Sequence, residues 1–291
     1  MVEGSYSWST QSHAGFDTTV VLVDTDEGLT GVGECCPLGP TYLPAYAHGV
    51  RAGIAQLAPH LIDKDPTQLD RINHLMDTQL KGHPYVKSAI DMACWDILGK
   101  ATGLPVYVLL GGKLQEKVTL YKVVSRADPN AMAERIPEYR DKGFHQFQVK
   151  VGEDPSTDII RIHRVAEEME AGEVLNADAN TGWKQHEALQ VAHGIADIGK
   201  QTGIRLTFEQ PCLSYHECLA VRQHTNLPFV LDECMDSINA LLQAQHDHAM
   251  DMINLKISRF GGITRARQVR DLCVSLGLPM NVEDSWGGEI T

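Results

Sequence analysis

The sequence lacks long apolar segments and has fewer basic than acidic residues. Among its 291 residues, Lys and Arg number 25 and Asp and Glu number 38, so the formal net charge at pH 7 is −13. Because nucleic acids are bound through clustered Lys and Arg, this balance argues against a nucleic-acid partner. No apolar run approaches the length of a membrane span, and Met1 is not followed by a basic and then an apolar segment, as in a secretion signal. We therefore expect no membrane association and a cytoplasmic location.

Cysteine pairs with the spacing of a zinc site are also missing. The seven cysteines include no CxxC motif, and their odd number argues against a complete disulfide framework. They are expected to be reduced thiols. Hydrophobic residues make up 43% of the chain and charged residues 22%, which is typical of a globular protein.

The N-terminal part reads as an α+β domain. Residues 18–24 (TTVVLVD) and 29–34 (LTGVGE) flank an Asp-Glu-Gly turn and predict a β-hairpin. Residues 87–100 carry an apolar stripe at helical spacing that ends before Gly103 and Pro105. We place this domain at residues 1–114. No strand is evident before the hairpin, so a first strand is expected to be missing.

From residue 115 to residue 291 short apolar strands alternate with longer amphipathic helices. Seven strands are predicted, at VTLYKVV, QFQVKV, VLNAD, RLTFEQ, PFVLDE, MINLKI and PMNVE. Repeated βα units of this kind favour a TIM-type barrel of parallel strands. An open doubly wound sheet is the alternative. It is disfavoured because no glycine-rich phosphate turn follows the first strand.

Carboxylates end three consecutive predicted strands, at Asp178, Glu209 and Asp232. In a barrel these ends converge on one mouth, where three anionic groups would repel one another unless a hard cation lay between them. The sequence therefore predicts a Mg²⁺ site with these three ligands. A single such acid would more simply be a solvated strand end, but three in register favour the metal.

Two lysines also end strands. Lys150 ends the second strand and Lys256 the sixth, which places them on opposite sides of an eight-stranded barrel. Each could reach one face of a planar carbon intermediate. Mg²⁺ and the second ammonium are expected to lower the pKa of each lysine and allow it to act as a base. The alternative is that both lysines only neutralise the acids.

These motifs resemble the muconate-lactonizing and mandelate racemase-like branch of the enolase superfamily. The resemblance is carried by the strings QVKVG, NADANTGW, FEQPC, LDEC and LKISRFGGITRARQVRD, and by PLGPTYLPAY and KSAIDMACWDILGK in the N-terminal part. It implies a modified TIM barrel behind an α+β capping domain. It also implies Mg²⁺-dependent removal of the proton next to a carboxylate, with an enolate intermediate and with Lys150 and Lys256 as the acid/base pair.

One position departs from the family pattern. Many members carry Lys-x-Lys on the second strand, whereas this chain has Gln148 before Lys150. A neutral amide weakens the local positive field, which points away from multiply charged substrates. Gln148 and Asn180 are expected to contact the substrate. Glu233 and Asp284, beside the predicted ligand and lysine positions, are expected to support them.

In detail, these sequence motifs are most similar to those of proline-betaine and hydroxyproline-betaine epimerases, and nearly as similar to those of cis-3-hydroxyproline dehydratases. Tyr42 and Trp286 could face a substrate ammonium through cation–π contacts, although either could equally be a packing residue. The first interpretation is therefore an epimerase or racemase of a proline-type amino acid or its betaine. The expected partners are a small carboxylate, carrying a quaternary ammonium in the betaine case, and further copies of the chain.

Two alternatives stay open. A dehydratase would remove the same α-proton and then expel a β-hydroxyl group. Relatives continue beyond the seventh strand, so the chain is also expected to be a barrel truncated at its C-terminal end, whose edge would be prone to aggregation. From this follows a third hypothesis, an inactive chain that serves as a binding subunit.

Overall fold

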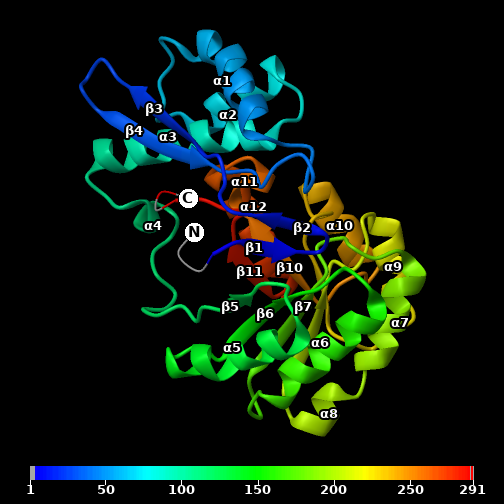
Figure 1. Ribbon diagram of the computed structural model, residues 1–291. Coiled ribbons are helices and arrows are strands. Elements are labelled where there is room, and N and C mark those ends of the chain that lie inside the picture. Colours follow the sequence, from blue (N-terminus) through cyan, green and yellow to red (C-terminus); the bar gives the residue numbers. More distant parts are fainter. Residues whose placement is uncertain (1–3, 289, 291) are drawn as a thin grey trace. The chain divides into compact units, whose positions relative to one another are not determined.

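The computed structural model describes residues 4–288 and residue 290 (Figure 1). The chain forms two compact units, and each of them combines two stretches of sequence. The first unit contains residues 1–15 and 118–253, and the second contains residues 16–117 and 254–291. The division predicted from the sequence, at residues 114 and 115, stays a prediction.

The first unit is built on parallel strands. They are β5 (Lys122–Val124), β6 (Gln146–Lys150), β7 (Val174–Asp178), β8 (Arg205–Glu209), β9 (Phe229–Leu231) and the start of β10 (Met252–Lys256). Neighbours in this series pair in parallel, in the order of the sequence. With β11 (Met280–Glu283) they complete a seven-stranded sheet. The α/β architecture with seven predicted strands is thus confirmed, because consecutive βα units place each new strand beside the last.

Helices follow the strands of this unit. They are α5 (Pro129–Asp141), α6 (Pro155–Glu167), α7 (Gln185–Ile195), α8 (Ile198–Thr202), α9 (Tyr215–Arg222) and α10 (Ile238–His246). Asp128 and Asp154 each cap a helix that starts with proline, and both side chains accept hydrogen bonds from backbone N–H groups of the first turn. Such Asp-Pro pairs start a helix sharply. The strand therefore ends at a defined residue before each helix begins.

Two short strands precede the hairpin, where none was predicted. They are β1 (Tyr6–Trp8) and β2 (Gln11–His13), which pair with each other in antiparallel fashion. Ser9 between them donates from its backbone N to Val151 O across 3.1 Å and from Oγ to Gly152 O across 3.0 Å. The segment thereby lies against the residues that follow β6. Three residues are too few to show a strand periodicity, which explains why the sequence did not reveal them.

The second unit contains the predicted hairpin, β3 (Thr19–Asp24) and β4 (Thr30–Cys35), followed by α1 (Ala47–Leu61), α2 (Leu69–Gln79), α3 (Pro84–Thr102) and α4 (Val106–Leu109). Helix α3 is buried along most of its length, and β4 packs against it. A Cβ atom on Gly33 would lie 1.9 Å from Ala89 O, so only glycine permits this close approach. The core of the unit contains Leu57, Ile72, Met76, Val86, Ile90 and Cys94.

The last part of the chain also belongs to the second unit, with the end of β10, α11 (Ile257–Phe260), α12 (Ile263–Leu276) and β11. Asp91 of α3 is buried and accepts hydrogen bonds from Thr264 N at 2.9 Å, Thr264 Oγ1 at 2.6 Å and Asn73 Nδ2 at 2.6 Å. This carboxylate joins α2, α3 and α12. Within the described residues, no helix has the length and apolar character needed to cross a membrane.

Candidate metal and acid/base site

The carboxyl ends of β7, β8 and β9 carry the three predicted ligands. In the sheet register Asp178 lies opposite Glu209, and Glu209 lies opposite Val230, two residues before Asp232. All three side chains are at most 1% exposed. Burying three carboxylates at one sheet edge is costly unless positive charge or hydrogen-bond donors compensate them.

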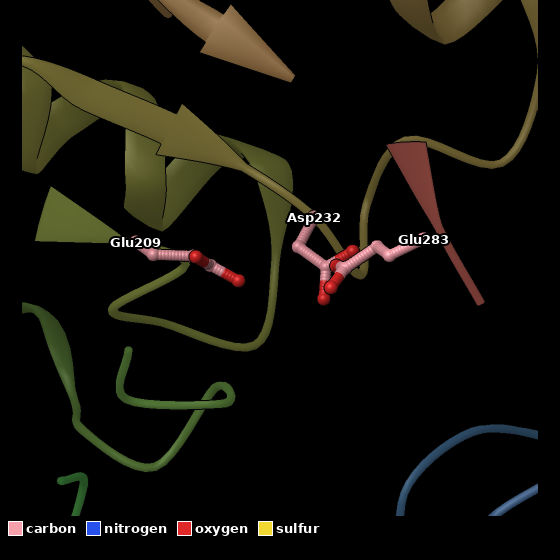
Figure 2. A group of neighbouring side chains, drawn as sticks. All are labelled: Glu209, Asp232 and Glu283. Atoms are coloured by element: carbon pink, nitrogen blue, oxygen red, sulfur yellow. The ribbon is translucent and has the colours of Figure 1, made fainter. Parts of the chain in front are cut away.

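Glu209 and Asp232 come close together. Each offers a carboxylate oxygen, and these oxygens lie within 4.8 Å of each other (Figure 2). Glu209 also accepts hydrogen bonds from Gln148 Nε2, at 3.3 and 3.2 Å, and from Asn176 Nδ2. Gln148, predicted to contact the substrate, therefore holds the Glu209 carboxylate in this structure. The third side chain in Figure 2, Glu283, is part of the second unit and is described with it below.

Asp178 has a different partner. Its Oδ2 accepts a hydrogen bond from Lys150 Nζ, and its Oδ1 accepts one from Asn180 N at 2.8 Å. The ammonium of Lys150, 5% exposed, also lies 5.9 Å from the ring centroid of Tyr6 on β1. The predicted base and one predicted metal ligand thus form a buried ion pair beside an aromatic ring.

The charge state of Lys150 follows from these neighbours. Burial by itself would lower the pKa of Lys150, but Asp178, Tyr6 and Glu209 together raise that pKa well above its usual range. The sequence argument expected a lowered pKa because it placed a bound Mg²⁺ and a second ammonium beside this lysine, and that expectation stays a prediction. A role for Lys150 as a base therefore requires that its pairing with Asp178 be weakened.

The donor set fits a magnesium ion. The predicted ligands Asp178, Glu209 and Asp232 supply only oxygen donors, and they end adjacent strands of one unit. Mg²⁺ prefers carboxylate oxygens and keeps further coordination positions for water or substrate. The two close carboxylates, Glu209 and Asp232, are buried anions of the kind that a hard cation would neutralise. Sulfur and nitrogen ligands, which would favour zinc, are absent from this set.

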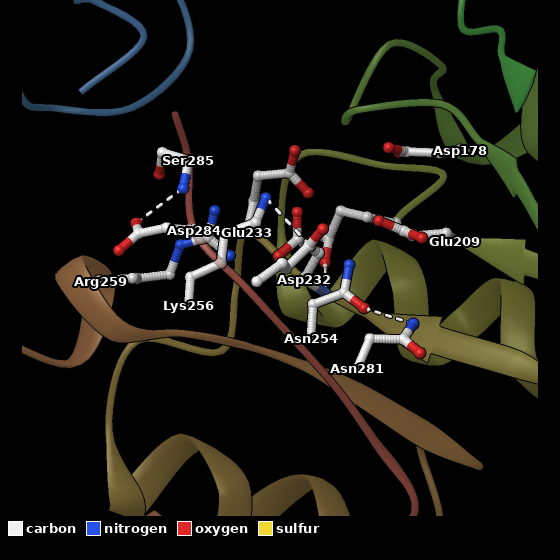
Figure 3. Close-up of polar contacts among 12 residues, drawn as sticks. Asp178, Glu209, Asp232, Glu233, Asn254, Lys256, Arg259, Asn281, Asp284 and Ser285 are labelled. Carbon is white, nitrogen blue, oxygen red and sulfur yellow. Dashed lines mark hydrogen bonds and ion pairs between the residues drawn. The ribbon is translucent and has the colours of Figure 1, made fainter. Parts of the chain in front are cut away.

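The second predicted lysine lies in the other unit, in its own cluster. Lys256 Nζ and Arg259 Nη2 each donate a hydrogen bond of 3.0 Å to the phenolic oxygen of Tyr42. The ring of Tyr42 lies 5.5 Å from Lys256 Nζ and 6.0 Å from the Arg259 guanidinium carbon. Lys256 also forms an ion pair with Glu283 of β11, with an Nζ to Oε1 distance of 3.5 Å. Figure 3 shows Lys256 and Arg259 side by side.

The remaining predicted site residues have clear positions within their own units. Asn180 donates from Nδ2 to Glu233 Oε1 across 3.0 Å. Asp284 accepts from Ser258 Oγ at 2.8 Å and from Ser285 N at 2.7 Å (Figure 3), and burial raises the pKa of its carboxyl. The Trp286 ring packs on Phe16 with centroids 4.5 Å apart. Substrate contacts of Asn180 and Trp286, and the supporting roles of Glu233 and Asp284, stay predictions.

The sequence argument did not identify Tyr6, Asn176 or Arg259. Asn176 lies two residues before Asp178 on β7, so strand alternation places both on one face, and this signal could have been used. Tyr6 gave no such signal, because its strand was not predicted. Arg259 lies within the quoted string LKISRFGG but beyond the strand end that was considered.

Two family profiles match the chain. One, described as the mandelate racemase/muconate lactonizing enzyme N-terminal domain, matches residues 6–111. The other, described as the enolase C-terminal domain-like family, matches residues 131–291.

Similar proteins of named activity include a dehydratase and a racemase. The chain is 52% identical over 289 residues to the cis-3-hydroxy-L-proline dehydratase of Roseibium aggregatum, a match that covers 99% of this chain and 77% of the relative. It is 30% identical over 274 residues to an N-succinyl-L-Arg/Lys racemase of Bacillus cereus, which covers 93% of this chain and 73% of that protein.

Solved structures agree with the fold. A mandelate racemase/muconate lactonizing enzyme from Roseovarius nubinhibens superposes with a TM-score of 0.93 at 40% identity, over 99% of this chain and 76% of that chain. A second structure from the same organism, in complex with magnesium, superposes with a TM-score of 0.91 at 34% identity, over 99% and 77% of the two chains.

Proposed function

The chain belongs to the mandelate racemase/muconate lactonizing enzyme family of the enolase superfamily, and from this premise we propose that it dehydrates a 3-hydroxyproline-type amino acid. The observation that carries this proposal is the 52% identity, over almost the whole chain, to a cis-3-hydroxy-L-proline dehydratase. The epimerase interpretation made from the sequence is not confirmed, since the named racemase is only 30% identical.

The proposed reaction is a β-elimination. The bond between the α-carbon and its proton breaks, and its electron pair forms the double bond between Cα and Cβ. The bond from Cβ to the hydroxyl oxygen breaks, and the departing oxygen takes up a proton and leaves as water. The cyclic enamine that remains rearranges to a cyclic imine, so no oxidant or reductant is needed.

Lys150 and Lys256 are the residues proposed to move these protons. One amine accepts the α-proton, and the other, as an ammonium, supplies a proton to the departing oxygen. A bound Mg²⁺, held by Asp178, Glu209 and Asp232, would neutralise the negative charge that grows on the substrate carboxylate. Gln148 keeps Glu209 in place through its two hydrogen bonds of 3.3 and 3.2 Å.

The surroundings of Tyr42 are unfavourable for a substrate ammonium group against its ring. Its ring already lies near two protein cations, Lys256 and Arg259. A quaternary ammonium against the same ring would meet their repulsion, and it has no N–H group with which to form hydrogen bonds. This argues against the ammonium-binding role that was predicted for Tyr42.

Proton NMR in D₂O with Mg²⁺ tests the proposal. We expect cis-3-hydroxy-L-proline to disappear while signals of the cyclic imine grow, whereas proline and proline betaine stay unchanged. The protein treated with EDTA is the control. If hydroxyproline persists while proline or its betaine exchanges its α-proton and inverts, the dehydratase proposal is wrong and the epimerase is correct.

A further inference from the structure

Gln210 follows the predicted ligand Glu209 directly, and its contacts reach the loops after three strands. Its backbone N donates to Val230 O of β9 across 2.9 Å, and its backbone O accepts from Thr181 N, after β7, across 2.9 Å. Its side-chain Oε1 accepts from Asp232 N across 2.8 Å. Gln210 therefore contacts segments adjoining all three predicted ligands, within one unit.

The other end of the side chain is also held. Nε2 donates to Cys212 O across 3.0 Å and to Cys218 Sγ across 3.5 Å. Oε1 accepts a further hydrogen bond from Cys234 Sγ across 3.3 Å. The side chain is fully buried, so these contacts are made without competition from water.

The backbone of Gln210 adopts a conformation that is unfavourable in free energy for a residue with a side chain. Its φ is +31°, in the left-handed region that glycine adopts more readily. A residue with a side chain is disfavoured at such an angle, because its Cβ atom crowds the backbone. The contacts of the amide offset this cost, because glycine in the same place would leave Asp232 N without its acceptor.

We infer that Gln210 is a positioning residue that sets the separation of Glu209 and Asp232 before a metal ion binds. The inference rests on the magnesium site of the proposed function. Two carboxylates held at a fixed separation favour Mg²⁺ over Ca²⁺. Mg²⁺ needs metal–oxygen distances of about 2.0–2.1 Å, whereas Ca²⁺ accepts about 2.3–2.6 Å and a more variable coordination geometry. Gln210 thus contributes to the choice of ion without touching it.

Two variants test this, Gln210→Gly and Gln210→Leu, with Mg²⁺ and Ca²⁺ affinities measured by calorimetry. Gln210→Gly suits the positive φ and leaves space for water, so it is expected to fold. Mg²⁺ affinity should fall about tenfold or more, the usual effect of losing a residue that orients ligands. Ca²⁺ affinity should change about threefold or less, since Ca²⁺ tolerates flexible geometry.

Glu173→Gln is the matched control. Glu173 is a buried residue of the same unit, but it precedes β7, at the opposite end of that strand from Asp178. Its carboxylate accepts from Arg140 Nε at 2.9 Å and from Arg140 Nη2 at 2.8 Å. This variant should lose stability while both ion affinities stay as in the parent. A loss of selectivity there as well would mean that any destabilisation has this effect, and would overturn the inference.

The outcomes separate the inference from the proposed function. A parent protein that binds no Mg²⁺ contradicts the proposed metal site, and the inference with it. If the parent binds Mg²⁺ and Gln210→Gly binds it equally well with unchanged selectivity, only the role of Gln210 is wrong. If Gln210→Leu does not fold, the Mg²⁺ and Ca²⁺ affinities of Gln210→Gly alone test the role of Gln210. Hydrogen exchange of the Asp232 N–H in metal-free protein is a second readout, and it should be faster in Gln210→Gly than in Glu173→Gln.

Discussion

Lys256 Nζ donates a hydrogen bond to the phenolic oxygen of Tyr42 across 3.0 Å, and these residues are 214 positions apart in the sequence. Arg259 donates to the same oxygen. A phenol oxygen that receives two cationic donors restricts the lysine to one direction. The proposed acid/base residue Lys256 is therefore positioned by a residue of the loop between β4 and α1.

Removal of this oxygen tests the relationship. In Tyr42→Phe the ring stays, but Lys256 and Arg259 lose an acceptor, and hydrogen bonds to charged groups contribute about 1.5–3 kcal/mol. We expect a lower melting temperature and a kcat reduced by about tenfold, which is less than the roughly hundredfold to ten-thousandfold contribution of a positioned acid or base, because Lys256 itself is retained. Tyr46→Phe is the control, because Tyr46 is 50% exposed. Equal kcat and stability in both variants would show that the contact is incidental.

Lys150→Met should separate catalysis from metal binding. The variant removes the proposed acid/base group, so turnover should fall by about a hundredfold to ten-thousandfold. Mg²⁺ affinity should not decrease, because Asp178 loses the ammonium that pairs with it. Steady-state kinetics and calorimetry measure the two effects, with Lys142→Met, at an exposed position, as the control. Full activity in Lys150→Met would remove this residue from the proposed reaction.

Asp232→Asn should weaken Mg²⁺ binding and raise the stability of the metal-free protein. Its carboxylate and that of Glu209 are both buried with oxygens within 4.8 Å, so neutralising one relieves repulsion. In EDTA we expect the variant to melt at a higher temperature than the parent. With Mg²⁺ at about 100 times its Kd the parent should gain about 2.7 kcal/mol, and the variant much less. A variant that melts lower in EDTA and is still stabilised by Mg²⁺ like the parent would contradict the ligand role.

The lowered pKa of Glu173 predicts how the free energy of unfolding changes with pH. Burial alone would raise its pKa, but hydrogen bonds from Arg140, Glu170 N and His145 keep the pKa of this carboxyl below its ordinary value of 4.5. A depressed pKa in the folded state stabilises the protein above the unfolded pKa, and this contribution is lost as pH falls through the folded pKa. Unfolding in urea at pH 7 and at pH 4 and below should show a smaller acid-induced loss in Glu173→Gln than in the parent. At pH 7 the variant should be less stable by about 1–3 kcal/mol. Parallel pH curves would refute this.

The sequence by itself determined the strand order and the positions of the charged strand ends. Apolar strands alternating with amphipathic helices predict a parallel sheet, and the absence of a glycine-rich turn after the first strand favoured a barrel in sequence order over a doubly wound sheet. Asp178 and Glu209 could be placed at strand ends because each apolar run stops there. The pairing register then puts the two opposite each other.

Only the tertiary structure decided which side chains these residues meet. Lys150 pairs with Asp178 and lies near Tyr6, and Lys256 pairs with Tyr42, although none of these contacts follows from local spacing. Periodicity reports which face of an element is buried, whereas the partner of a buried charge depends on how distant segments pack. For the same reason only the structure shows that Asp178 raises the pKa of Lys150, since a neighbouring carboxylate acts through distance and burial rather than through position in the chain.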